Sequence, residues 1–180
     1  GPLKGAVAWS NGAQAVLGPH VGDQEGLGNR QRLIDTIQDA EQLYRFHPEM
    51  VAHDAHPDYF TTTWAQKQSE ESKPIPANPS FAKGPQQSRP GLHTNGPTLV
   101  SLHHHHAHAV AGMLEHGWLD RNVLAVTWDG TGYGADGTIW GGEFLAATAT
   151  AYDRVATIRP FCLPGGEMAI REPWRITAAL

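Results

Sequence analysis

The stretch Asp129-Gly130-Thr131-Gly132-Tyr133-Gly134 separates two apolar runs, 123–128 and 138–145. An apolar run, a glycine-rich segment and a second apolar run together predict a β-hairpin. Glycine carries no Cβ, so backbone N–H groups in such a turn can converge on phosphate oxygens. Asp129, at the strand end, is placed to take a metal ion or a metal-bound water there. An ordinary tight hairpin explains the same residues, because a glycine-rich run alone is a weak motif.

A histidine run, His103-His104-His105-His106-Ala107-His108, lies upstream of that stretch. Within it, His104 and His108 have i,i+4 spacing, which on a helix puts both imidazoles on one face within reach of one ion. His105 is expected to point outward into solvent. The segment is predicted to be an amphipathic helix, because apolar residues follow at the spacing of one helical face: Ala107, Val110, Ala111 and Leu114.

The histidine pair predicts a metal site that needs further ligands. Two imidazoles cannot fill a tetrahedral or octahedral shell, so carboxylate or substrate oxygens must supply the rest. A solvated histidine patch is the alternative, but the apolar stripe favours a structured segment. A purification tag would be terminal and unbroken, whereas this run is internal and Ala107 interrupts it.

Composition excludes several classes of protein. The chain has 180 residues and a net charge of −5 with no basic run, so no extended nucleic-acid contact is expected. No apolar run approaches the ~18 residues that a membrane span requires, so no membrane partner is expected. The single Cys162 excludes an intrachain disulfide framework and is typical of a cytoplasmic protein. Its apolar neighbours predict a packed small residue rather than a nucleophile.

Strand and helix patterns alternate along the rest of the chain. Short apolar runs predict strands over 4–10, 13–18, 50–53, 98–102 and 155–159. Helical spacing predicts helices over 33–44, over 54–68 and from Pro173 onward. Residues 69–97 are rich in proline and polar residues without periodicity, which predicts a surface loop.

This order predicts an α/β protein of two lobes, because the second half restarts the pattern of the first. Antiparallel strands followed by strand–helix crossovers build a mixed sheet covered by helices. We expect a first lobe over 1–121, including the loop at 69–97, and the opening strands of a second lobe over 122–180. That second lobe is expected to be incomplete and the chain a fragment.

Four further segments carry a family resemblance: Leu3-Lys4, 51–59, 136–144 and 163–175. Together with the histidine run and the glycine-rich stretch, they are similar to the HypF family, the carbamoyltransferases that mature nickel–iron hydrogenases. The resemblance implies an actin-like, sugar-kinase-like ATPase fold of the ribonuclease H-like class, shared with tRNA threonylcarbamoyltransferases. It covers most of the chain except 69–97.

The resemblance also implies an activity. In the family, this domain passes a carbamoyl group from carbamoyl-adenylate, an ATP-derived intermediate, to the C-terminal cysteine of a dehydratase partner. The product is dehydrated to the cyanide ligand of the hydrogenase iron. Other domains of the same enzyme, which this sequence lacks, make the carbamoyl-adenylate.

The family's site residues map onto particular positions here. The metal pair corresponds to His104 and His108, with Asp129 as a further ligand of iron or zinc. Arg171 and Glu172 are candidate catalytic residues, although the same segment also reads as a strand-to-helix connector. The residues expected against the nucleotide are Asp129, Gly130, Thr131, Gly132, Gly134 and Lys4.

Two other functions stay open. The first is an O-carbamoyltransferase or another ATPase of the same fold, such as a small-molecule kinase, which would share most of these features. The histidine pair disfavours a kinase, because a kinase would rely on acidic residues and Mg²⁺. A truncated remnant that only docks to a partner would need no active site.

Overall fold

The computed structural model describes residues 4–45, 47–71, 96–166 and 168–180. It consists of two compact units, Gly1–His104 and His105–Leu180. Among the described residues each unit has a hydrophobic core of its own. No helix in these ranges is both long and apolar enough to cross a lipid bilayer.

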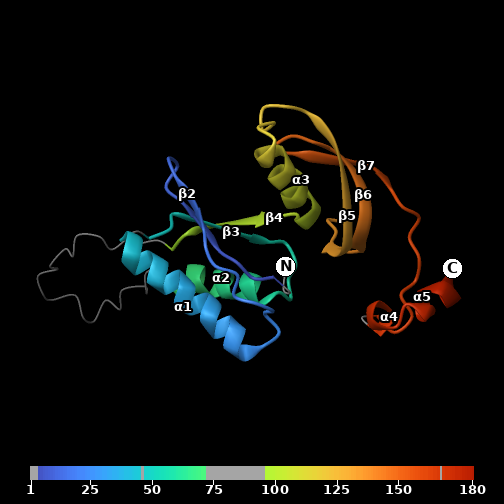
Figure 1. Ribbon diagram of the computed structural model, residues 1–180, viewed down its shortest axis with the longest axis horizontal. Helices are drawn as coiled ribbons and strands as arrows, with labels where there is room; N and C mark the ends of the chain where they lie inside the picture. The colour runs from blue at the N-terminus through green and yellow to red at the C-terminus, as the bar shows by residue number, and fades with distance from the viewer. Residues whose placement is uncertain (1–3, 46, 72–95, 167) are drawn as a thin grey trace, which may run out of the picture. The chain divides into compact units, whose positions relative to one another are not determined.

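The first unit contains a hairpin and a parallel strand pair with two helices. Strands β1 (Ala8–Ser10) and β2 (Ala15–Leu17) are antiparallel, and helix α1 (Leu27–Tyr44) follows them. Strand β3 (Met50–Asp54), helix α2 (Phe60–Glu71) and strand β4 (Thr98–Leu102) then form a crossover in which β3 and β4 are parallel (Figure 1).

Apolar residues of α1 form the centre of this unit. Leu33 and Ile37 of α1 are buried together with Val21, and Phe60 and Trp64 of α2 pack against them. Leu33, Ile37 and Ala40 recur at helical spacing and are buried, which confirms the predicted periodicity for this part of the helix, whereas Leu43 and Tyr44 near its end are 75% and 51% exposed.

The second unit packs one helix on an antiparallel sheet. Helix α3 (His104–Glu115) begins directly after β4, and the boundary between the units falls in its first turn. The sheet order is β5-β6-β7, with α3 on one face (Figure 1). The remaining bounds are β5 (Val123–Tyr133), β6 (Ile139–Ala147), β7 (Tyr152–Thr157), α4 (Met168–Arg171) and α5 (Trp174–Ala179).

The predicted buried face of the histidine helix is wrong. His105, expected in solvent, is 0% exposed, whereas Leu114, expected in the core, is 64% exposed. The His105 ring packs near Trp140, and His106 Nε2 lies 2.9 Å from the Thr148 carbonyl oxygen. A stripe of apolar residue types cannot reveal this face, because imidazoles occupy part of it.

The sequence predicted that the glycine-rich stretch forms the tip of its hairpin, and this prediction is wrong. Strand β5 continues to Tyr133 and contains an irregularity in register between Trp128 and Gly132. The chain reverses later, where the Gly134 N–H donates to the Thr138 carbonyl oxygen. Glycine marks both bulges and turns, so the run itself did not distinguish the two.

Several predicted bounds also need correction. Helix α2 begins at Phe60 rather than at Asp54, and only Ala8–Ser10 of the expected first strand is a strand. In the described part of the first unit the strands form two separate two-stranded sheets instead of one mixed sheet. Cys162, expected to be packed, is exposed. Most of the loop predicted over 69–97 lies outside the described residues, which leave out 72–95.

Candidate functional site

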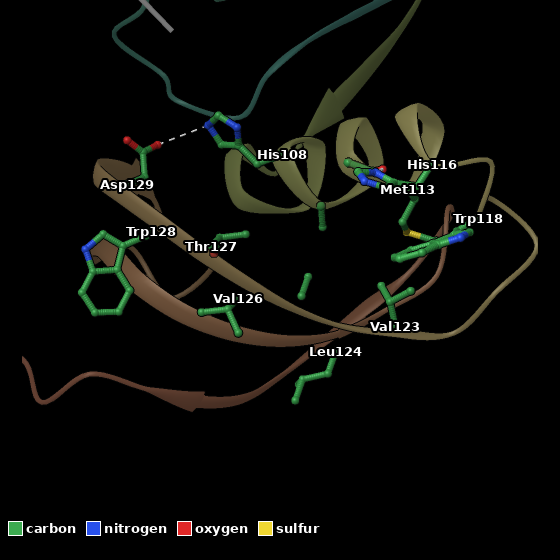
Figure 2. Close-up of a pocket in the computed structure, with 13 residues that line it drawn as sticks. His108, Met113, His116, Trp118, Val123, Leu124, Val126, Thr127, Trp128 and Asp129 are labelled. Atoms are coloured by element: carbon green, nitrogen blue, oxygen red, sulfur yellow. Dashed lines mark hydrogen bonds and ion pairs between the residues drawn. The ribbon is translucent and has the colours of Figure 1, made fainter.

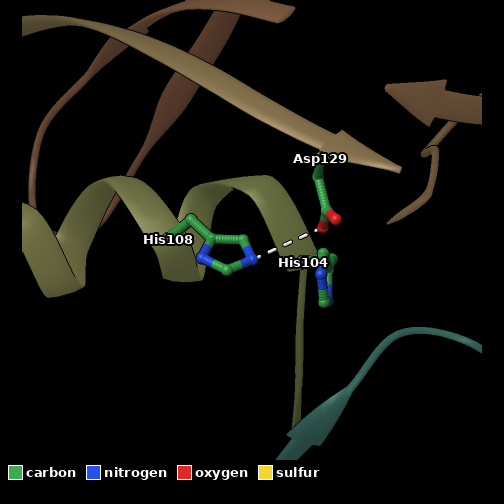
Figure 3. A group of neighbouring side chains, drawn as sticks. All are labelled: His104, His108 and Asp129. Carbon is green, nitrogen blue, oxygen red and sulfur yellow. Dashed lines mark ion pairs between the residues drawn. The ribbon is translucent and has the colours of Figure 1, made fainter. Parts of the chain in front are cut away.

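Two histidines of α3 and one aspartate of β5 converge on a single point (Figure 3). His104, His108 and Asp129 each offer one ligand atom, and these atoms lie within 4.8 Å of one another. They form the one group of three or more histidine, cysteine or acidic residues with metal-binding spacing in the described ranges. The structure therefore brings together the three residues that the sequence predicted as metal ligands.

Helix α3 determines which histidines can reach this point. His105 and His106 face the sheet, where the His106 ring also lies 4.9 Å from that of Tyr152. Because His105 and His106 turn their face of the helix toward the sheet, the i,i+4 pair His104 and His108 lies on another face. His108 is mostly exposed, whereas His104 is largely covered.

Asp129 is oriented by the backbone that follows it. Its Oδ1 accepts a hydrogen bond of 2.7 Å from the Gly130 N–H. Its Oδ2 lies 3.4 Å from His108 Nε2 (Figures 2 and 3). The irregular register of β5 begins at this point of the strand, and bulges commonly redirect side chains near functional sites.

A fourth residue, Asp54 at the end of β3, supports the cluster through His104. Asp54 Oδ2 lies 2.8 Å from His104 Nδ1, and its Oδ1 accepts the His56 N–H at 2.9 Å. Burial raises the pKa of Asp54, but the hydrogen bonds from His104 and from the His56 backbone outweigh it, so the pKa lies below its usual range. Asp54 is therefore a carboxylate at neutral pH.

Sequence reasoning missed Asp54, which it placed at the start of a helix. The available signal was topological. Parallel strands end at the same edge of a sheet, and Asp54 pairs in register with Leu102, two residues before His104.

The donor set fits a transition metal better than magnesium. Two imidazole nitrogens and one carboxylate oxygen suit zinc or iron, whereas Mg²⁺ prefers an all-oxygen octahedron. Three protein ligands would leave at least one position for a water molecule or a substrate oxygen, as in catalytic zinc sites.

A groove between α3 and β5 adjoins the cluster (Figure 2). It has a volume of about 450 Å³, within the range typical of small-molecule sites. His108 and Asp129 face each other at one end, and Met113 and Trp118 lie toward the other (Figure 2).

The other predicted site residues lie in varied surroundings. Gly130, Thr131 and Gly132 are part of β5, and a Cβ placed on Gly130 would meet no heavy atom within 4 Å. Lys4 is exposed. Arg171, the last residue of α4, is also exposed, and Glu172 accepts a 2.6 Å hydrogen bond from Arg175.

Gly134 differs from Gly130, because its neighbourhood is closed. A Cβ there would collide with the Trp140 indole and the Asp136 carboxylate. Packing of the hairpin thus explains this glycine without a ligand.

Comparison with known proteins adds a family context. Residues 1–115 match a family described as the HypF Kae1-like domain, and residues 125–180 match the second subdomain of a Kae1-like carbamoyltransferase domain. The chain is 37% identical over 180 residues to carbamoyltransferase HypF of Synechocystis, covering all of this chain and 20% of that protein. It is 34% identical over 179 residues to carbamoyltransferase HypF2 of Cupriavidus necator, covering 99% of this chain and 19% of that protein.

A solved structure is similar as well. The crystal structure of full-length HypF in its phosphate- and nucleotide-bound form superposes with a TM-score of 0.77 at 31% identity. The match covers 97% of this chain and 20% of that one. The chain thus spans about a fifth of the length of these relatives.

Proposed function

Because this chain belongs to the HypF Kae1-like domain family, we propose that it transfers a carbamoyl group from carbamoyl-adenylate to the C-terminal cysteine of a hydrogenase-maturation partner. The observation that carries the proposal is the convergence of His104, His108 and Asp129. Relatives named carbamoyltransferases match over the whole chain, which supports the reaction class. The remaining four-fifths of such a protein would supply the carbamoyl-adenylate.

The proposed reaction is an acyl transfer from a mixed anhydride. The partner's cysteine sulfur forms a bond to the carbamoyl carbon, while the bond from that carbon to the adenylate oxygen breaks. AMP leaves with the bonding electron pair, and the thiol proton passes to solvent. No nucleophile of this chain is needed, so exposed Cys162 has no role in this scheme.

The chain's own residues would bind and orient. His104, His108 and Asp129 would hold a divalent iron or zinc ion, which supplies Lewis-acid stabilisation of negative charge on the leaving phosphate or the carbamoyl oxygen. Gly130 supports close approach of a nucleotide, because the space beside its Cα is open. The adjoining groove supports the same assignment, and one related structure was solved with phosphate and nucleotide bound.

Arg171, Glu172 and Lys4 stay predictions for substrate contact. Glu172 pairs locally with Arg175, so a catalytic role would require that ion pair to open. Arg171 is exposed and has no such ion pair among the described residues, so it is the better candidate for phosphate or carbamate oxygens.

An O-carbamoyltransferase is the second candidate function, because the same three ligands and groove would serve a hydroxyl acceptor. The decisive assay supplies carbamoyl-adenylate and either a peptide ending in cysteine or its serine counterpart. Transfer to the cysteine peptide alone is expected. Transfer to serine alone would favour the second function, and transfer to neither would leave a docking module.

The metal assignment has its own test. Purified chain is expected to contain iron or zinc at about one ion per molecule, with strong depletion in His104→Ala and in His108→Ala. His20→Ala is the matched control, because His20 is exposed and lies outside the cluster. Equal metal content in all four proteins would contradict the site.

A further inference from the structure

We propose that Asp54 is a positioning residue for His104: it selects the imidazole tautomer whose Nε2 lone pair is available to the metal. This inference rests on the proposed function, because it assigns a supporting role at the same metal site. It concerns a residue outside the three-ligand cluster.

The contact itself determines the tautomer. Asp54 Oδ2 lies 2.8 Å from His104 Nδ1, and a carboxylate can only accept hydrogen bonds. Nδ1 must therefore carry the proton and donate it. In the neutral ring the other nitrogen, Nε2, then has the lone pair that a metal ion requires. Carboxylate–histidine–metal chains of this kind raise the basicity of the ligand and fix the plane of its ring.

Asp54 can orient His104 because its own position is fixed from three sides. The His56 N–H donates to its Oδ1 at 2.9 Å, and the Thr62 hydroxyl, on a buried residue of α2, donates to its carbonyl oxygen at 2.9 Å. The next residue, Ala55, donates its N–H to the Leu102 carbonyl oxygen at 2.9 Å.

The arrangement distinguishes the two histidine ligands. His104 is held by Asp54 and is largely covered, whereas His108 is mostly exposed and has Asp129 as its neighbour at 3.4 Å. His104 is thus the preset ligand, because a side chain that is already held loses less freedom when it binds a metal ion.

The experiment compares zinc affinity among variants of the 180-residue chain. Zinc is titrated in competition with a chromophoric chelator into wild type, Asp54→Asn, Asp54→Ala and Asp23→Asn. Asp23→Asn is the matched control, because Asp23 Oδ1 accepts the backbone N–H of Glu25 two residues on, just as Asp54 accepts that of His56. We expect zinc binding to weaken about 10–100-fold in Asp54→Ala, less in Asp54→Asn, and not in Asp23→Asn.

A second readout follows the ring without metal. In long-range ¹H–¹⁵N spectra, with His104→Gln used for assignment, His104 of the wild type is expected in the Nδ1–H form. Asp54→Ala is expected to shift it toward the Nε2–H form. A role of Asp54 in folding alone would change the melting temperature without changing this tautomer, and Asp54→Asn keeps the test available if the alanine variant does not fold.

The outcomes separate the two proposals. If His104→Ala abolishes zinc binding while both Asp54 variants bind zinc as the wild type does and keep its His104 tautomer, the positioning role is overturned and the metal site stands. If zinc binding is absent, or is unaffected by His104→Ala, the metal site fails and the role of Asp54 fails with it.

Discussion

Neighbouring histidines of one run have different environments, and this decides their roles. His105 and His106 pack against the sheet of the second unit and act as core residues. His104 and His108 lie one turn apart on another part of the helix surface and meet Asp129. A single-residue change in this run therefore has an effect that depends on position: loss of packing at His105, and loss of a proposed metal ligand at His104.

A buried ion pair in the second unit gives a prediction at the same scale. Glu143 of β6, with a side chain only 2% exposed, accepts a 2.6 Å hydrogen bond from Arg154 of β7. Arg154→Met would leave this buried carboxylate without its cationic partner, although its other oxygen would still accept the Gly141 N–H. Loss of one partner of a buried pair typically costs ~3–5 kcal/mol; because Arg154 is 25% exposed, we expect about 2–3 kcal/mol by urea unfolding.

Arg175→Met is the control for that measurement. Arg175 donates to Glu172 at the same 2.6 Å distance, but both side chains are partly exposed. Exposed pairs contribute ~0–1 kcal/mol, so this variant should unfold almost as the wild type does. Equal losses in the two variants would show that the burial of Glu143 has no special weight.

Asp136 makes stability depend on pH in the acid range. Hydrogen bonds from the Thr138 side chain and backbone, with others from Trp140 and the charge of Arg154, lower the pKa of Asp136 from 3.8 to about 2. A carboxyl with a lowered folded-state pKa stabilises the fold above its unfolded pKa, here 3.8, and loses that effect as pH falls through about 2. Urea midpoints of wild type and Asp136→Asn should thus differ by a constant amount above pH 4 and converge toward pH 2. A difference that persists unchanged at pH 2 would contradict the pKa.

At the scale of elements, two glycines of one hairpin should respond differently to the same change. Gly134→Ala places a Cβ against the Trp140 indole, and overpacking of this kind costs ~1–3 kcal/mol. Gly130→Ala meets open space, so its unfolding free energy should stay within ~0.5 kcal/mol of the wild type. Urea unfolding gives both values, and a large loss in Gly130→Ala would mean that packing requires this glycine after all.

The order of elements was predictable from the sequence, but their faces and contacts were less so. Alternating apolar runs predicted the strands of both hairpins, and helical spacing predicted α1. The sequence did not reveal the buried face of α3, because imidazoles occupy part of that face. It did not reveal the register irregularity in β5 either, because glycine also marks turns. The i,i+4 pair predicted two ligands from local geometry, whereas the contact of Asp54 with His104 spans 50 residues and depends on the pairing of β3 with β4.

For the whole molecule, the second unit leaves apolar side chains in solvent. Alternate residues of β5 point to opposite faces, and α3 covers only one of them. Leu124, Val126 and Trp128 lie on the side away from the helix (Figure 2) and are 64%, 54% and 77% exposed. Among the residues that the structure describes, β5 is an edge strand that pairs with β6 alone. Exposed apolar residues on an edge strand favour association.

We therefore expect this chain on its own to associate as its concentration rises. Light scattering should give an apparent mass above 19.5 kDa for the wild type and a mass near that value for the double variant Val126→Lys, Trp128→Lys, because charges on an edge strand oppose pairing. The control is Leu27→Lys, Leu43→Lys, which adds the same charge at two exposed leucines of α1. Since the net charge moves from −5 to −3 in both double variants, a fall in mass in β5 alone assigns the effect to this strand. Equal masses in the two double variants would attribute association to charge or to another surface.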